Sequence, residues 1–573
     1  MENPSAEHRL VPGWLAPVAL AVAMVCVCAV GITWGLPSPE RNRLYFRSPA
    51  TLAARKRAIQ NSNPDEAWRK WGPYAKEGTE SPSDRSLYNA LRTYHPDEYA
   101  VLKVLMNIRP EEGRLDPKFY HLGGAFLYPY GALLYLLGKA GVLHLTTDPT
   151  YYLDHPREIA AFYLVGRLLC AAFAVGTVLI VYALGKKLHS RTLGILGGLS
   201  LVVMPAFSLH SHFLYVDIPA AFWATLAVWG AVAYLENRKA RAAVLAGLFA
   251  GLAVGTKVST APLVGVVALS LLFVDGSARK RLALAGASVL ASLAAFAATN
   301  PFAVWHFSLF SGDVRSNAFV NVSFAPYLVI LAKSAGPVLA VLLVVGVILA
   351  LLKALKDVRF APALIWVPVL FLVACLFGKR YARYLLPILP VAALLAALPA
   401  AMLFERRRTV SGWVVFLAGF LYNLAWTVSL LVVLRSADTR TAAGEALQER
   451  FPLGTRLAVT EVPWQYEMPA FDDLAYDAAV VGYDPRRLSD SAAELLITSE
   501  AQITRSSRDD PDARVFWKAF DENVAAANYR LLLRVERPQT FLGLPMNPGM
   551  FPEDMRYHNP AVLIYSSSAS SAD

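Results

Sequence analysis

The sequence predicts an all-α polytopic membrane domain followed by a C-terminal soluble α/β domain. Of its 573 residues 56% are hydrophobic, and the mean hydropathy of +0.41 excludes an ordinary soluble protein. Apolar runs long enough to cross about 30 Å of hydrocarbon recur from Val11 to Leu434. Beyond them, polar and apolar segments alternate among prolines and charges. We therefore place the membrane domain at residues 1–434 and the soluble domain at residues 435–573.

The first apolar run, Pro12–Trp34, is too long for a cleavable signal and lacks a clear small-residue cleavage site, so we interpret it as an anchor. Turn or charge signals separate the apolar runs that follow. These cover residues 158–184, 192–208, 216–235, 242–256, 259–274, 282–298, 326–352, 360–377, 384–404 and 411–434. The four cysteines all lie inside apolar runs, which indicates neither a disulfide framework nor a metal site.

Every second connection after residue 158 is rich in lysine and arginine, as cytoplasmic loops are. The basic connections contain Lys186, Lys187 and Arg191; Arg238, Lys239 and Arg241; Arg279, Lys280 and Arg281; Lys353, Lys356 and Arg359; and Arg406, Arg407 and Arg408. The connections around 210–217, 256–259, 300–326 and 378–384 are therefore expected outside, together with the C-terminal domain. Much of the formal charge of +11 lies in these loops, which favours orientation in a membrane over binding to nucleic acid.

The first long loop, residues 35–157, allows two arrangements. Arg41 to Arg57 follow the anchor closely, and charge counting alone places them inside, in which case Phe119–Leu137 has to span. In the alternative the loop lies outside and Phe119–Leu137 lies along the membrane surface. The glycines, Pro129 and tyrosines of that segment make a poor straight helix and suit an interface, which favours the outward loop.

This loop contains the tetrapeptide His95-Pro96-Asp97-Glu98. An acidic pair just outside the first span suits an enzyme that deprotonates an acceptor at the bilayer surface. The alternative is that Asp97 caps a helix beginning near Glu98, because aspartate is a favoured N-cap.

The order and spacing of several motifs resemble the GT-C superfamily of polytopic glycosyltransferases, among them the bacterial relatives of protein O-mannosyltransferases and of the lipid A aminoarabinose transferase. No single motif is specific, and the resemblance covers residues 11–434. The motifs are the acidic pair, Asp116-Pro117 with its tyrosine-rich segment, the span with Arg167, Gly185-Lys186-Lys187, residues 211–219 (SHFLYVDIP), Gly255-Thr256-Lys257 and residues 380–387 (RYARYLLP). The resemblance implies an extracytoplasmic first loop, an N-terminus inside and about eleven spans.

The resemblance also implies an activity. A sugar linked to a polyprenyl phosphate is transferred, with inversion, to a lipid, glycan or protein acceptor on the outer face of a bacterial inner membrane. Asp97 matches the position of the family's general base, and Glu98 could hold the acceptor or a neighbouring cation. We expect no cofactor and no nucleic-acid partner.

The departing phosphate requires cations or aimed donors on the outer face. Lys379, Arg380 and Arg383 form a basic cluster on an outward loop, an exception to the orientation rule that an anionic lipid headgroup explains. The alternative is interfacial anchoring by snorkelling side chains. Tyr381 and Tyr384 alternate with these charges at headgroup depth, and we include Tyr384 in the predicted phosphate-binding set.

Three more charged residues are candidates. Arg167 lies about two and a half turns into its span, and the acidic pair or the donor phosphate is its expected partner. Lys257, at the tip of a short outward hairpin, could reach the same phosphate or only snorkel. Asp217 is a second acid or acceptor-binding residue, or else an N-cap. With His210 and His212 it matches no compact ligand set, so we predict no metal.

The C-terminal segment shows short strands near 456–460, 494–498 and 529–535 and helical patterns near 439–450 and 513–528. It contains no nucleophile elbow, phosphate loop or Cys/His cluster, so we expect it to cover the site or help to bind the acceptor. A transporter or lipid flippase is the alternative function, but such proteins carry internal repeats that are not found here. A non-catalytic protein that binds a lipid-linked sugar is the other.

Overall fold

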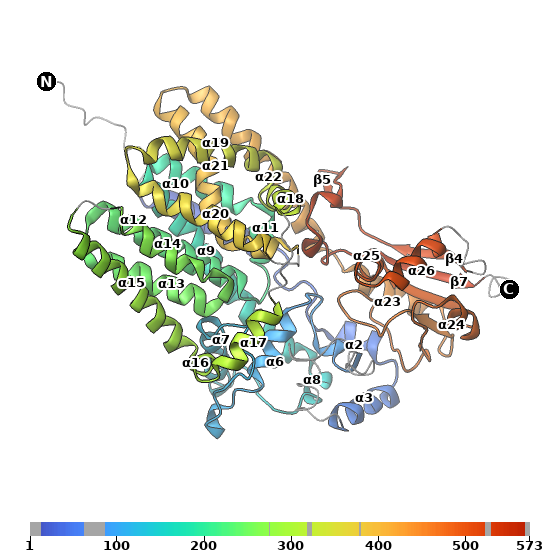
Figure 1. The fold of residues 1–573 in the computed structure, drawn as a ribbon. Helices are drawn as coiled ribbons and strands as arrows, with labels where there is room; N and C mark the ends of the chain where they lie inside the picture. The colour runs from blue at the N-terminus through green and yellow to red at the C-terminus, as the bar shows by residue number, and fades with distance from the viewer. Residues whose placement is uncertain are drawn as a thin grey trace.

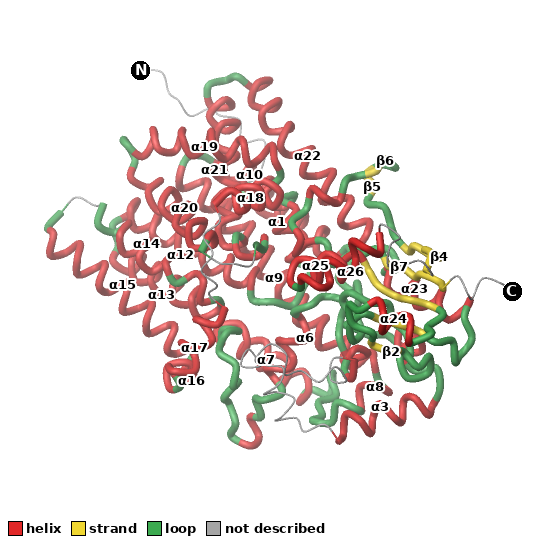
Figure 2. Tube along the Cα trace, turned by 45° about the vertical axis from the view of Figure 1, so that its right-hand side comes forward, coloured by secondary structure: helices red, strands yellow, loops and turns green. Residues whose placement is uncertain are grey.

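The computed structural model describes residues 13–61, 86–273, 276–317, 324–376, 380–521 and 529–567. A large helical bundle occupies one side of the molecule, and a smaller domain that contains the strands lies against it (Figure 1). Figure 2 shows that the described strands are confined to this smaller domain. The predicted fold class, a helical membrane domain followed by an α/β domain, is confirmed.

Each of the apolar runs predicted from the sequence contains a helix. Among the described residues, seven helices are long and apolar enough to cross a membrane when the one-turn helices η4 (Val358–Phe360) and η6 (Leu386–Ile388) are counted with the helices that follow them. These seven are α9 (Pro156–Leu188), α12 (Asp217–Asn237), α15 (Ala278–Thr299), α19 (Pro337–Ala354), α20 (Ala361–Cys375), α21 (Leu389–Glu405) and α22 (Thr409–Arg435). The shorter apolar helices are α1 (Leu15–Ala29), α10 (Arg191–Val202), α13 (Ala240–Thr256), α14 (Pro262–Ser270) and α18 (Phe324–Ala335).

Two of the predicted runs are interrupted at a proline. The run 192–208 divides between α10 and α11 (Pro205–His210), and the run 326–352 divides between α18 and α19. In both cases proline occupies the first turn of the second helix, where its missing N–H leaves no bond unmade. Gly336 precedes α19 with a φ of 86°, a conformation that glycine adopts readily.

Charged connections gather at the two ends of the bundle. At one end Lys187 pairs with Glu236, and Arg359 donates to the carbonyl of Lys187 (2.9 Å) and lies 3.6 Å from Glu236. At the other end Lys257 pairs with Asp217. The connections that the charge pattern assigns to opposite sides of the membrane thus lie at opposite ends of the helices, as a polytopic protein requires.

The first loop forms several short helices, and one of them corrects an expectation. The segment 119–137 was expected to be a poor helix, but α7 (Gly124–Lys139) is a helix of 16 residues with Pro129 inside it. Tertiary contacts anchor its start: Gly123 N–H donates to the Thr256 carbonyl (3.2 Å), and Gly124 N–H donates to Asn300 Oδ1 (2.7 Å). Packing therefore outweighs low intrinsic propensity. The other helices of the loop are α2 (Pro39–Tyr45), α3 (Pro49–Asn61), α6 (Glu98–Leu105) and α8 (Tyr151–Asp154).

The C-terminal domain contains a five-stranded sheet of order β2-β1-β3-β7-β4. β1 pairs in parallel with β2 and β3, whereas β7 runs antiparallel between β3 and β4. The strands are β1 (Leu457–Val459), β2 (Ala479–Val480), β3 (Leu495–Ser499), β4 (Tyr529–Val535) and β7 (Val562–Ser567), with a separate hairpin of β5 (Thr540–Phe541) and β6 (Leu544–Pro545). All of β3 is buried, because helices cover both faces of the sheet.

Helix α23 packs on one face of this sheet, and α24 and α26 pack on the other. The helices of the domain are α23 (Thr439–Arg450), α24 (Pro485–Asp490), α25 (Glu500–Asp509) and α26 (Pro511–Asp521). The three predicted strands and the helix at 439–450 are confirmed. The predicted helix 513–528 is confirmed as far as Asp521, and its remainder lies outside the described residues. β7 and α25 were not predicted from the sequence.

The C-terminal domain is anchored to the loop segment that precedes the tetrapeptide. Arg440 of α23 is fully buried, bonds to both oxygens of Asp438 (2.7 and 2.6 Å), and lies 4.1 Å from the centre of the Tyr94 ring. The Tyr94 hydroxyl lies 2.8 Å from Thr441 Oγ1. Tyr94 is the residue before His95, so these contacts fix the tetrapeptide against the C-terminal domain.

Candidate active site

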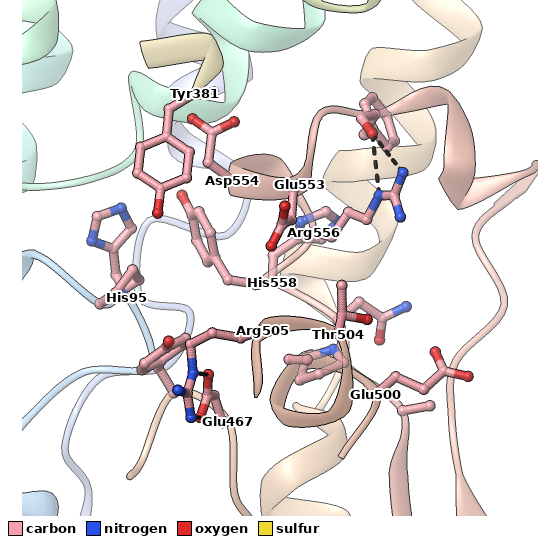
Figure 3. Close-up of a pocket in the computed structure, with 18 of the residues that line it drawn as sticks. His95, Tyr381, Glu467, Glu500, Thr504, Arg505, Glu553, Asp554, Arg556 and His558 are labelled. Atoms are coloured by element: carbon pink, nitrogen blue, oxygen red, sulfur yellow. Dashed lines mark hydrogen bonds and ion pairs between the residues drawn. The ribbon is translucent and has the colours of Figure 1, made fainter. Parts of the chain in front are cut away.

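A cavity of about 710 Å³ lies where the bundle, the first loop and the C-terminal domain meet. The first loop contributes His95 and Asp97, the start of α12 contributes Asp217, and the connection between α20 and α21 contributes Arg383. Figure 3 looks into the cavity and shows side chains of the C-terminal domain, such as Asp554, on its walls. Parts of the chain that are remote in sequence therefore share one polar chamber.

Asp97 forms an ion pair at the edge of this cavity. It occupies the N-cap position of α6, but its side chain makes no capping hydrogen bond. Its carboxylate pairs with Arg383, which lies in the 3-10 turn η5 (Ala382–Tyr384). The two side chains are 26% and 20% exposed. The Asp97 side chain therefore does not cap the helix, which was the alternative role for this residue.

The environment keeps the Asp97 carboxyl ionised. Burial raises the pKa of Asp97, but the Arg383 guanidinium outweighs this effect and holds the pKa below its usual range. His95 fixes the backbone here, because its Nδ1 accepts from the Asp97 N–H (3.1 Å). The His95 ring stacks on Phe213 with centroids 4.5 Å apart. Asp97 is thus a charged carboxylate in a defined position beside a cavity.

Glu98 has a different environment from its neighbour. Arg167 binds it in a fork, with Nε 2.8 Å from Oε1 and Nη2 2.7 Å from Oε2. The Glu98 oxygens also accept from the Thr93 hydroxyl (2.6 Å) and the Leu214 N–H (2.8 Å). Burial by itself raises the pKa of Glu98, but the interaction with Arg167 has the larger effect, and the pKa lies below its usual value. This carboxyl is therefore also ionised. Neither Glu98 nor Arg167 lines the cavity.

Arg167 is fully occupied by this arrangement. Its remaining nitrogen, Nη1, donates to the carbonyls of Ile32 and Trp34, each at 2.7 Å, and the side chain has no exposed surface. The acidic pair and the donor phosphate were the two partners expected for Arg167. In the structure it binds the acidic pair, through Glu98. These contacts tie α9 to the end of the first span and to α6.

Asp217 and Lys257 form another buried ion pair. Asp217 is in the first turn of α12, but Val216 holds the N-cap position, and the Asp217 side chain makes no capping bond. Lys257 lies with its Nζ 5.0 Å from the centre of the Tyr384 ring and 3.4 Å from the Arg383 carbonyl. The Asp217–Lys257 pair therefore lies next to the turn η5, which contains Arg383.

The C-terminal domain supplies two contacts to the Asp97–Arg383 pair that the sequence analysis missed. Asp554 accepts from the backbone N–H groups of Ala382 (2.9 Å) and Arg383 (3.2 Å). Burial raises the pKa of Asp554 to about 6. The Tyr557 ring packs edge-on against His95, with centroids 4.8 Å apart. No motif in the tail pointed to either residue, because their role depends only on where the domain docks.

The predicted phosphate-binding residues are placed unequally. Arg383 lines the cavity. Lys257 and Tyr384 lie next to Arg383 and do not line the cavity themselves. Arg380 is exposed and does not line the cavity. Lys379 lies outside the described residues.

The wall formed by the C-terminal domain is strongly charged. Arg505 binds Glu467 with two bonds (2.6 and 2.9 Å) and Glu461 with one (2.6 Å), as the lower part of Figure 3 shows for Glu467.

A second cavity, of about 940 Å³, lies under α6 and α7, and its charged residues include Glu111 and Lys139, which pair with each other. Within the described ranges, no group of three His, Cys, Asp or Glu side chains could hold a metal ion.

A protein-family model described as dolichyl-phosphate-mannose-protein mannosyltransferase matches residues 163–305. This stretch contains Arg167, Asp217 and Lys257, three of the residues on which the resemblance to GT-C glycosyltransferases was based. The resemblance is thereby confirmed. Among curated proteins, no sequence similar to the whole chain is found.

Three solved structures show a distant likeness to the chain. ArnT from Cupriavidus metallidurans, bound to undecaprenyl phosphate, is 13% identical with a TM-score of 0.45, and the match covers 96% of this chain and 98% of that one. The oligosaccharyltransferase AglB from Archaeoglobus fulgidus, with an inhibitory peptide and a dolichol-phosphate, is 15% identical with a TM-score of 0.46, covering 93% and 76%. Another structure of the Archaeoglobus enzyme, with Zn and sulfate, is 15% identical with a TM-score of 0.39, covering 75% of this chain and 66% of that one. All three scores lie below 0.5, so these likenesses carry no information on mechanism.

Proposed function

We propose that this protein transfers a sugar from a polyprenyl-phosphate-linked donor to an acceptor, with inversion, at the extracytoplasmic end of its helices. The observation that carries this proposal is the Asp97–Arg383 pair, a carboxylate base and a phosphate-binding cation at the edge of one cavity. A membrane protein in which both groups meet beside the ends of apolar helices has what a reaction on a lipid phosphate requires.

In the proposed reaction an acceptor hydroxyl or amine attacks the anomeric carbon from the face opposite the phosphate. Asp97 takes the proton of the acceptor as the new bond forms. The bond from the anomeric carbon to the phosphate oxygen breaks, and the lipid phosphate leaves with that electron pair. Arg383 stabilises the charge on the leaving phosphate, because its planar guanidinium can make two parallel hydrogen bonds to it.

The ion pair links donor binding to the readiness of the base. Before the donor binds, Arg383 holds the pKa of Asp97 low, which makes Asp97 a weak base. A donor phosphate competes for the same guanidinium and so releases the carboxylate. Asp97 is then a stronger base once the donor is bound, so deprotonation of the acceptor is favoured when the donor is in place.

Glu98 and Arg167 have a supporting role in this proposal. Both are fully buried and bonded to each other, so they fix the backbone next to Asp97 and do not contact substrate. The C-terminal domain, residues 435–573, forms the other wall of the cavity and is the part of the chain that we expect to select the acceptor.

The test is mass spectrometry of cell-envelope glycans and lipids from cells with and without the protein. Cells that express the native chain should contain a glycosylated product that cells without it lack. Asp97→Asn should reduce this product about a hundredfold or more, because a general base is lost while size and shape are kept. Expression and thermal stability should stay normal.

The matched control is Asp154→Asn. Asp154 is a first-loop carboxylate that pairs with Lys56, is 42% exposed and does not line the cavity. This variant should restore the product fully. Near-normal transfer by Asp97→Asn would show that the base lies elsewhere, with Asp217 the next candidate.

A further inference from the structure

Five buried polar atoms in the cavity lining have no hydrogen-bond partner within the described residues. They are His210 Nε2, Asp217 Oδ2, Gln539 Oε1, Tyr557 Oη and His558 Nδ1. The five residues are between 2% and 8% exposed, so bulk water does not reach most of their surface. Buried polar groups in native proteins are nearly always paired, and an unpaired group requires an explanation. Their concentration around one chamber indicates that a ligand supplies the partners.

Three of these atoms belong to residues that surround the Asp97–Arg383 pair. His210 and Asp217 flank the connection between α11 and α12, and Asp217 is bonded through its other oxygen to Lys257. Tyr557 contacts His95, which fixes the Asp97 backbone. The other two atoms belong to Gln539 and His558, which bond to each other (3.2 Å) within the C-terminal domain.

The chemistry of the three groups fits a neutral ligand with several hydroxyls. Asp217 Oδ2 accepts, whereas the His210 imidazole and the Tyr557 phenol can each donate or accept. Burial lowers the pKa of His210 to about 3, so its ring is neutral. Lys257 balances the charge of Asp217, and the remaining carboxylate oxygen disfavours an anion at this point. A sugar ring suits the set, because each hydroxyl both donates and accepts.

The apolar part of the lining agrees with this assignment. Phe213 and Tyr215 line the cavity beside the polar groups. The Phe213 ring lies 5.8 Å from the Tyr557 ring, almost edge-on. Aromatic rings with a few aimed polar groups are typical of sites that bind small molecules in one orientation. The C–H face of a sugar ring can pack on such a surface while its hydroxyls reach the polar atoms.

We propose that His210, Asp217 and Tyr557 form the subsite that binds the hydroxyl groups of the sugar carried by the lipid donor. The proposal rests on the proposed function and extends it from the lipid phosphate to the group that is transferred. Arg383 then holds the phosphate on one side of the anomeric carbon, and the three residues hold the ring. The sugar is oriented with its reactive carbon toward the acceptor that Asp97 deprotonates.

The experiment compares two ligands on purified protein in nanodiscs. One is an undecaprenyl phosphate without sugar, and the other is a panel of the same lipid phosphate carrying mannose, glucose, galactose or arabinose. In the native protein at least one sugar should bind more tightly than the bare lipid. Tyr557→Phe and His210→Phe should each reduce this extra affinity about threefold to tenfold and leave the affinity for the bare lipid unchanged.

Two further readouts separate binding from folding. Tyr557→Phe should unfold at the same or a higher temperature, because it removes an unpaired buried hydroxyl and keeps the ring against His95. The matched control is Tyr45→Phe, since the Tyr45 hydroxyl is also buried and unpaired within the described residues but does not line the cavity. This control should leave sugar affinity unchanged.

Four outcomes would overturn the subsite. Sugar affinity retained in both Tyr557→Phe and His210→Phe is one, and an equal loss in Tyr45→Phe is another. Binding of the bare lipid with no gain from any sugar would reject the subsite while leaving the proposed function in place. Failure of the bare lipid itself to bind would instead reject the proposed function, and the subsite with it.

Discussion

Two neighbouring carboxylates, Asp97 and Glu98, each pair with an arginine from a distant part of the chain, but their surroundings differ. The Glu98–Arg167 pair has no exposed surface, and every nitrogen of its guanidinium is bonded. The Asp97–Arg383 pair is 26% and 20% exposed and borders a cavity. The two residues differ in direction because Asp97 stands before the first turn of α6 whereas Glu98 begins it.

This difference is our reason for assigning a structural role to Glu98 and a chemical role to Asp97, although the two residues are adjacent. A pair that is closed to solvent and fully bonded can hold the loop against the bundle, but it cannot exchange partners with a substrate. A pair at a cavity can exchange partners, because a phosphate can replace the carboxylate at the guanidinium. The predictions below test this division, beginning with the largest expected effect.

Glu98→Gln should destabilise the protein strongly. The change leaves the Arg167 cation buried without its carboxylate, and breaking a buried pair in this way costs about 3–5 kcal/mol. We expect poor expression and a much lower unfolding temperature in detergent, measured by thermal denaturation. A variant that folds normally and loses only transfer would instead indicate that Glu98 holds the acceptor, the other role that the sequence left open for it besides binding a cation.

Arg383→Ala should weaken donor binding with a smaller effect on folding. A hydrogen bond to a charged group contributes about 1.5–3 kcal/mol, so affinity for undecaprenyl phosphate should fall roughly tenfold to a hundredfold. Arg383→Lys should restore only part of the loss, because an ammonium lacks the planar fork. Lipid binding and thermal stability are measured on the same samples. Unchanged affinity with lowered stability would show that Arg383 only anchors the loop.

The same residue should control the pH dependence of transfer. Asp97 has to be ionised to act as a base, and Arg383 lowers its pKa, so in the native protein the loss of transfer caused by protonation of Asp97 should come only well into the acid range. In Arg383→Ala the main group that opposes the effect of burial is lost, and the pKa of Asp97 rises. Activity should then begin to fall at a higher pH than in the native protein. The measurement is a pH profile of transfer at a donor concentration well below saturation, which reports on the free protein with its ion pair intact, and identical acid limbs would contradict the ion pair.

The apolar pattern of the sequence was sufficient to predict the architecture. Runs of about 20 apolar residues permit little except a spanning helix, because the backbone has to satisfy its own hydrogen bonds in lipid. The strands at 457–459 and 495–499 followed from short buried segments. Segment 119–137 was misjudged because glycine and proline counted against a helix, whereas the contacts of Gly123 and Gly124 hold its start in place.

The candidate site was predicted only in part, for a physical reason. Residue type and position identified Asp97 and Arg383, since an unusual charge at the membrane surface is visible in one dimension. Which residue of the acidic pair faces the cavity could not be predicted from the sequence, because this depends on the direction of each side chain. Asp554 and Tyr557 gave no signal at all, because their contacts exist only after the C-terminal domain docks on the loop.

Asp554 gives the smallest and most specific prediction. Its carboxylate accepts from the N–H groups of Ala382 and Arg383, so it positions the arginine that distinguishes the two ion pairs. Asp554→Asn keeps the shape but loses the charge, and we expect transfer at pH 8 to fall by about tenfold or less. Because the pKa of Asp554 is raised to about 6, the native protein should also lose transfer as the pH falls through 6, whereas the variant should not show this step.

Stability should change in the opposite sense to activity at this position. A carboxyl whose pKa is raised on folding stabilises the folded state when protonated, and this contribution is lost as the pH rises through about 6. Removing the charge should therefore leave the unfolding temperature at pH 8 unchanged or higher. Glu494→Gln, at a carboxylate of the same domain that lies 3.7 Å from Arg456 and does not line the cavity, is the matched control and should retain full transfer and the step near pH 6. If Asp554→Asn instead lowered stability and activity together at pH 8, its bonds to the Arg383 loop would support the fold in general rather than position the pair.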